Sequence, residues 1–152
     1  MTSPSTTLEN PSLISSPTKT ARWARAIARV LLGFVFFASG LTGLLMVAGV
    51  MPQPAPGSIP PAAEALSAAM MNSHYLFAFI KLTEVAVGAL LLSNRFVPLA
   101  LVVLAPVMLN VIAFHAFLAP SGLPIPVVLL ALHLFLAWSY RALYQPMLVA
   151  RA

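Results

Sequence analysis

The chain has 152 residues, of which 61% are hydrophobic and 7% are charged, whereas soluble domains carry about 25% charged residues. So few charged side chains cannot coat a soluble globule. An ordinary soluble enzyme is therefore excluded, and lipid is the expected solvent. The sequence contains no cysteine, which excludes disulfides, cysteine zinc sites and iron–sulfur clusters.

The N-terminal part of the chain divides into a polar tail and a long apolar run. Residues 1–20 are rich in Ser, Thr and Pro, and we expect a disordered tail because they bury too little to offset the cost of ordering. The apolar run that follows predicts a first membrane helix over about residues 24–50. It carries small residues that let helix backbones approach closely in lipid, namely Gly33, Ala38, Ser39, Gly40, Thr42 and Gly43.

The rest of the chain predicts one short helix and three further membrane helices. Prolines between residues 52 and 61 require an extended connection. The Ala-rich stretch after Pro61, with Glu64 in its first turn, predicts a short interfacial helix on the outer side. Apolar runs then predict helices over about residues 73–93, 96–118 and 123–144. The expected fold class is an all-α membrane protein in which residues 21–152 form a four-transmembrane-helix bundle.

The basic residues predict the orientation of these helices. With four crossings, seven of the eight fall on one side of the membrane, and Lys/Arg-rich ends stay in the cytoplasm. These seven are Lys19, Arg22, Arg25, Arg29, Arg95, Arg141 and Arg151. We therefore expect both termini to be cytoplasmic. The net charge of +5 is then explained by topology and by contact with anionic lipid, and we expect no nucleic-acid partner.

The eighth basic residue, Lys81, lies inside the second apolar run with Glu84 three positions later on the same helix face. Each charge costs about 2.5–3.5 kcal/mol near the middle of a membrane. The two side chains must therefore turn towards the interior of the bundle. Two interpretations stay open, because the pair could fix helix packing or could serve a ligand or a proton pathway.

Two more polar side chains are predicted at the depth of this pair. Counted from the outer ends of their helices, Asn110 and His133 lie within about 6 Å of Lys81 along the membrane normal. An isolated polar group in hydrocarbon would be unsatisfied. We therefore expect Lys81, Glu84, Asn110 and His133 to form a shared ligand-binding cluster.

The other two histidines are predicted nearer the outer surface. His74 and His115 are candidates for the outer mouth of the cluster, although interfacial or packed histidines explain them better. His115 and His133 differ in depth by about 10 Å on upright helices, which is too far for the two axial ligands of one haem. We expect no metal site and no intrinsic cofactor.

The segment YLFAFIKLTEVAVGALLLSNRFVPLALVVLAPVMLNVIAFHAFL, residues 75–118, resembles the DoxX-like family of small bacterial membrane proteins. The resemblance rests on Lys81-x-x-Glu84-x-x-x-Gly88, on Asn94-Arg95-Phe96-x-Pro98-Leu99 and on Pro106-x-x-x-Asn110. The early Gly33-x-x-Phe36…Gly40 and the late LFLAWSYR also fit, so that residues 26–148 are covered.

The resemblance implies a four-helix bundle in the bacterial inner membrane. Some relatives are described as subunits of quinone-linked sulfur oxidation or as partners in membrane redox complexes. It therefore implies an accessory redox subunit with a quinone as its borrowed cofactor and a membrane or soluble redox protein as its partner. The alternatives are a carrier for a small solute or protons and a structural anchor without a ligand. The sequence shows no self-contained catalytic motif, and its catalytic residues are unknown.

Overall fold

The computed structural model describes residues 18–144, and these residues are helical between short connections. The all-α prediction is thus confirmed. The predicted disordered tail falls on residues 1–20, of which 1–17 lie outside the described part, whereas Lys19 and Thr20 belong to the first helix. The helices are α1 (Lys19–Val47), α2 (Pro61–Asn72), α3 (Leu76–Leu92), α4 (Val97–Phe117), the 3-10 turn η2 (Pro120–Gly122), α5 (Pro124–Ser139) and α6 (Arg141–Tyr144).

Helix α1 begins earlier and ends earlier than its apolar run suggests. The Thr18 side chain accepts a hydrogen bond from the backbone N–H of Ala21 and so caps the N-terminus. At the other end Gly49 has φ +71°, the left-handed conformation that closes a helix with glycine. The N–H groups of Gly49 and Val50 then bond to carbonyls in the last turn. Capping residues therefore set the ends of α1, rather than the limits of the apolar run.

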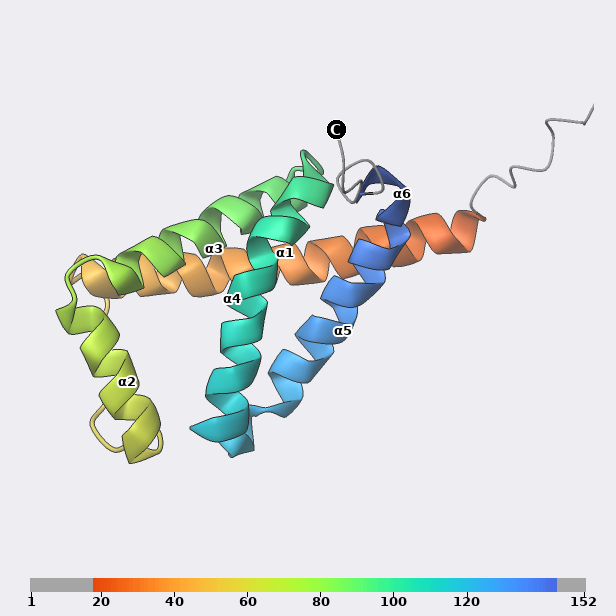
Figure 1. Cartoon of the computed structure of the whole chain (residues 1–152). Coiled ribbons are helices and arrows are strands. Elements are labelled where there is room, and N and C mark those ends of the chain that lie inside the picture. The colour runs from red at the N-terminus through yellow and green to blue at the C-terminus, as the bar shows by residue number, and fades with distance from the viewer. Residues whose placement is uncertain (1–17, 145–152) are drawn as a thin grey trace, which may run out of the picture.

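Helices α1 and α3 lie side by side and run antiparallel (Figure 1). Glycines make this approach close. A Cβ atom on Gly88 of α3 would lie 2.6 Å from the backbone nitrogen of Phe37, and one on Gly40 of α1 would lie 2.7 Å from the carbonyl oxygen of Lys81. Neither position has room for a side chain. The small-residue stripe that the sequence predicts as a packing surface thus faces α3.

Helices α4 and α5 form a second antiparallel pair, which crosses the first pair steeply in Figure 1. Helix α4 starts after Phe96, a non-glycine residue in the left-handed region with φ +51°. The two helices contain no glycine and contribute large buried apolar side chains to the core, chiefly Leu101, Leu104, Met108, Leu129 and Leu136. The upright arrangement that underlies the depth prediction is therefore not what Figure 1 shows.

Two of the described helices, α1 and α4, are long and apolar enough to cross a membrane. Helices α2 and α3 count as a third candidate span if they are taken together, although the chain bends by 92° between them. Helix α5 is apolar but has only 16 residues. At 29 residues α1 is about 43 Å long, which exceeds a hydrocarbon core of about 30 Å.

Candidate functional site

Lys81, Glu84 and Ser39 form a hydrogen-bonded group at the α1–α3 interface, called the polar triad below. The Lys81 Nζ atom lies 2.9 Å from Oε2 and 3.0 Å from Oε1 of Glu84. The Ser39 hydroxyl donates to Oε2 of Glu84 over 2.9 Å, and Lys81 Nζ donates to the Ser39 oxygen over 3.2 Å. Every member therefore contacts the other two, and the charges of Lys81 and Glu84 compensate each other between α1 and α3.

Glycines on α1 create the space for the Lys81 side chain. A Cβ atom on Gly43 would lie 2.5 Å from Cδ of Lys81, so the aliphatic part of the lysine runs across the bare backbone at Gly43. Its ammonium group also lies 5.5 Å from the centre of the Phe77 ring on α3. The glycine stripe thus serves two purposes, because it brings the helices together and directs Lys81 back along α1 towards Ser39.

The triad is buried at Glu84 and reaches the surface at its other two members. The Glu84 side chain is 4% exposed and the Lys81 side chain 17%, and Ser39 is an exposed residue of α1. Sequence reasoning assigned Ser39 only to the packing surface. Its position four residues before Gly43, on one face of α1, is the signal that could have paired it with Lys81.

The structure does not join Asn110 and His133 to this group by any hydrogen bond among residues 18–144. Asn110 is exposed on α4, and its amide nitrogen donates to the Pro106 carbonyl of the same helix over 3.3 Å. His133 on α5 is 6% exposed, and its Nδ1 atom has no hydrogen-bond partner within the described part. Within this part of the chain no hydrogen bond therefore links Asn110 or His133 to the polar triad, and depth along a helix specifies neither rotation about its axis nor its lateral position.

The two outer histidines occupy different environments. His74 is exposed, with φ +63°, in the bend between α2 and α3. His115 is half-buried, with its Nδ1 atom 2.8 Å from the Val111 carbonyl oxygen. A Cβ atom on Gly122 would lie 2.7 Å from the His115 ring. His115 therefore packs against the turn between α4 and α5. The His74 side chain makes no hydrogen bond within residues 18–144.

Several contacts bring the basic ends of the helices together. The Arg29 guanidinium group donates to the carbonyl oxygens of Leu91 and Leu92, which lie at the C-terminus of α3. A cation at that position is favoured by the partial negative charge of a helix end. The Tyr144 hydroxyl donates to the Pro98 carbonyl over 3.2 Å and so joins α6 to the start of α4. Burial raises the pKa of Tyr144 above its ordinary value.

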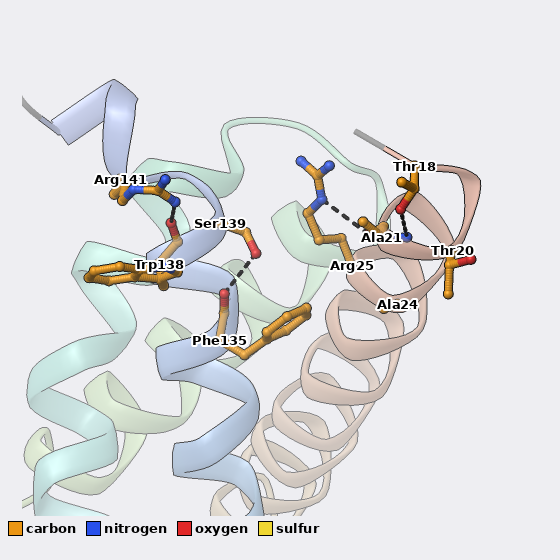
Figure 2. A pocket seen from close by; sticks show the side chains of 9 residues that line it. All are labelled: Thr18, Thr20, Ala21, Ala24, Arg25, Phe135, Trp138, Ser139 and Arg141. Carbon is orange, nitrogen blue, oxygen red and sulfur yellow. Dashed lines mark hydrogen bonds between the residues drawn. The ribbon is translucent and has the colours of Figure 1, made fainter. Parts of the chain in front are cut away.

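A shallow cavity of about 470 Å³, widely open to the surface, lies between the start of α1 and the end of α5 (Figure 2). A second cavity of about 350 Å³ borders the same end of α1. Neither is lined by a member of the polar triad. The first is lined by Thr18, Thr20, Ala21, Ala24, Arg25, Phe135, Trp138, Ser139 and Arg141, and the second by Lys19, Arg22, Trp23 and Ala26.

A comparison with protein families matches residues 24–117 to the DoxX family. The matched segment covers most of the chain and includes all three residues of the polar triad. The chain therefore belongs to the DoxX family and is a membrane protein of that family, as its sequence motifs predict. Searches of curated proteins and of solved structures gave no match.

Proposed function

We propose that the chain crosses the bacterial inner membrane four times, with both termini in the cytoplasm. The contacts of Arg29 with the end of α3 and of Tyr144 with the start of α4 support this topology. They link α1 at Arg29 to the end of α3, and α6 to the start of α4. In Figure 1 the α3–α4 turn lies at the top centre, with α6 and then the N-terminal part of α1 to its right. All basic residues of the described part except Lys81 are in these segments, as the positive-inside rule requires.

Reporter fusions test this topology directly. A reporter placed after Arg95, in the α3–α4 turn, is expected to be cytoplasmic, and one placed after Gly57, in the α1–α2 connection, is expected on the outer side. Positions within α2 and within the α4–α5 connection serve as independent checks of the same side as Gly57. Reporters after Arg95 and Gly57 that reside on the same side would contradict the four-span topology.

Within this topology the polar triad supports an accessory role in a quinone-linked redox complex. A quinone takes up two electrons and two protons when it is reduced to a quinol. Its carbonyl oxygens need hydrogen-bond donors in an apolar environment. The Lys81 ammonium is a donor that reaches the surface of the otherwise apolar α1–α3 pair, and a quinone carbonyl would replace the exposed Ser39 oxygen as one of its acceptors. Lys81 would donate to a carbonyl oxygen, and Glu84 would hold or pass a proton behind it. Electron transfer would belong to a membrane or soluble partner protein.

The observation that carries this proposal is the graded burial of the triad, with the covered Glu84 carboxylate behind the Lys81 ammonium, which reaches the surface. The test is the quinone content of the full-length protein purified in mild detergent. We expect bound quinone in the wild type and its loss in the double variant Lys81→Met with Glu84→Leu. The control is Thr83→Val, because Thr83 lies between the two charges but bonds to the Phe79 carbonyl instead.

Asn110 and His133 stay candidate ligand residues, and Asn110→Leu and His133→Leu test them separately from the triad. Equal quinone content in the wild type and in the Lys81/Glu84 double variant would contradict a quinone site at the triad. A wild type without quinone would do the same, provided that the protein is folded by circular dichroism and carries its normal complement of lipid.

A structural anchor is the second candidate, and a specific observation favours it. The hydrogen bonds within the triad already satisfy both oxygens of Glu84 and supply Lys81 with three acceptor atoms. Such a closed ion pair can specify helix packing without a ligand. The anchor predicts a double variant that is as stable as the wild type and a wild type without quinone. A carrier would need a cavity that opens at the triad, and the two cavities described above are lined by other residues.

A further inference from the structure

We propose that the cavity between the start of α1 and the end of α5 binds the phosphate headgroup of an anionic phospholipid, with Arg25 as its main ligand. The inference concerns a site separate from the polar triad. It rests on the proposed membrane placement only in requiring that this end of α1 lies at a lipid headgroup layer. It holds whichever side of the membrane that layer faces.

The geometry of Arg25 supports a ligand in this cavity. Its Nε atom donates to the Ala21 carbonyl over 3.2 Å, which fixes the guanidinium group against α1. Figure 2 shows this group in the space between α1 and α5, across from Ser139. The two terminal nitrogens of Arg25 make no hydrogen bond within residues 18–144. A half-buried guanidinium with a free outer edge suits a phosphate, which accepts two parallel N–H bonds.

Charge compensation supports the same ligand. The acidic residues of the described part are Glu64 and Glu84. Glu64 accepts a hydrogen bond from the backbone of Gly57, and Glu84 belongs to the polar triad. No carboxylate of the described part pairs with Arg25, because the ion pair found there joins Lys81 to Glu84. An anion from outside these residues is therefore the natural counter-charge of Arg25.

The surroundings favour a lipid over a soluble phosphate ester. Phe135 and Trp138 line the cavity beside Arg25, and Trp138 is 69% exposed. The Arg141 guanidinium stacks on the Trp138 ring at 4.9 Å and marks the polar border of α5. Below this border the exposed faces of both helices are apolar, with Ile27 and Leu31 on α1 and Leu134 on α5. A headgroup at Arg25 would thus have its acyl chains against apolar side chains.

The experiment uses the full-length protein with Trp23→Phe, which leaves Trp138 as its single tryptophan. The protein is placed in phosphatidylcholine nanodiscs that contain increasing fractions of phosphatidylglycerol with brominated acyl chains, because bromine quenches tryptophan fluorescence at short range. Brominated phosphatidylcholine is the reference lipid. Both leaflets of a nanodisc have the same composition, so a wrong topology would not affect the result.

We expect phosphatidylglycerol to bind beside Trp138 about fivefold more tightly than phosphatidylcholine, because one basic residue at an anionic surface contributes about that factor. Arg25→Gln should abolish the preference. Arg22→Gln is the matched control, because it removes the same charge from the same helix end on the exposed face, and it should retain most of the preference.

Three results would overturn the proposal. The first is equal quenching by the two brominated lipids in the wild type. The second is an equal loss of preference in Arg25→Gln and Arg22→Gln, which would indicate diffuse surface charge. The third is displacement of the brominated lipid by millimolar glycerol 3-phosphate, which would indicate a site for soluble phosphate esters. A quinone-free protein, by contrast, would contradict the proposed function and leave this site unaffected.

Discussion

The two antiparallel helix pairs of this protein, α1–α3 and α4–α5, are held together by different kinds of contact. Each pair is called a hairpin below, although α2 lies between α1 and α3 in the chain. Helices α1 and α3 meet through backbone contacts at Gly40 and Gly88, and they enclose the polar triad. Helices α4 and α5 contain no glycine and contribute large apolar side chains such as Leu104 and Leu136 to the core. Both solutions work in lipid, where close packing and hydrogen bonds replace the hydrophobic effect as the force between helices.

The comparison shows where specificity resides. Apolar side chains of α4 and α5 can exchange for others of similar volume, because dispersion contacts have little directionality. The α1–α3 hairpin tolerates less, because its glycines fix the distance between backbones and its triad fixes their register. Lys81 and Glu84 on α3 can bond to Ser39 only in the register that places Ser39 opposite them. Substitutions in the two hairpins should therefore differ in kind, and the following predictions test that difference.

The largest effect is expected from breaking the ion pair on one side. Lys81→Met leaves Glu84 buried and without its cation, which should destabilise the protein by about 3–5 kcal/mol. Unfolding by sodium dodecyl sulfate in mixed micelles measures the change, and Arg95→Met at an exposed turn is the control. The double variant Lys81→Met with Glu84→Leu should recover most of the loss. A double variant less stable than Lys81→Met would contradict the role of charge pairing.

A large-to-small substitution in the other hairpin should cost slightly less. Leu104 on α4 is fully buried, and Leu104→Ala should destabilise by about 2–5 kcal/mol through lost contacts and a cavity. Leu109→Ala on the exposed face of the same helix should be near neutral. Leu104→Met should restore most of the stability, since similar volumes substitute well. If Leu104→Met were as harmful as Leu104→Ala, the view of α4–α5 as a permissive interface would be wrong.

Adding volume should harm the glycine-packed hairpin selectively. Gly88→Leu forces the backbone of α3 away from Phe37, and overpacking of this kind costs about 1–3 kcal/mol. Its neighbour Ala89 is exposed, so Ala89→Leu should leave the unfolding midpoint nearly unchanged. A cysteine pair across α1 and α3 would report the separation of the helices by crosslinking. Equal midpoints for the two leucine variants would show that the close approach at Gly88 is unimportant.

The smallest effect is expected at the contact between Arg29 and the end of α3. Arg29→Gln loses a cation that bonds to the Leu91 and Leu92 carbonyls, and charge-assisted bonds of this type contribute about 1–2 kcal/mol. Hydrogen exchange of the last turn of α3 should increase more than that of the first turn. Arg22→Gln, which removes an exposed charge from the same helix, should change neither. Uniform exchange along α3 in Arg29→Gln would argue against a local cap.

Much of the architecture could be read from local sequence properties. Apolar periods and breaks at Pro and Gly predicted the helical class and the short helix after Pro61, because the backbone must satisfy its own hydrogen bonds in lipid. The spacing of Lys81 and Glu84 placed them on one face, and the structure confirms their ion pair. The DoxX motifs predicted the family that the family comparison confirms. Each of these inferences depends on residues close in the chain.

The partners across helices were decided by the tertiary structure alone. Ser39 joins Lys81 and Glu84 because glycines let α1 approach α3 there, whereas Asn110 bonds within α4. The contact of Arg29 with Leu91 and the cavity beside Arg25 likewise join segments far apart in the chain. Sequence spacing determines which residues share a helix face, but the rotation, tilt and crossing of helices follow from the packing of all of them together. The polar triad therefore became visible only in the folded molecule.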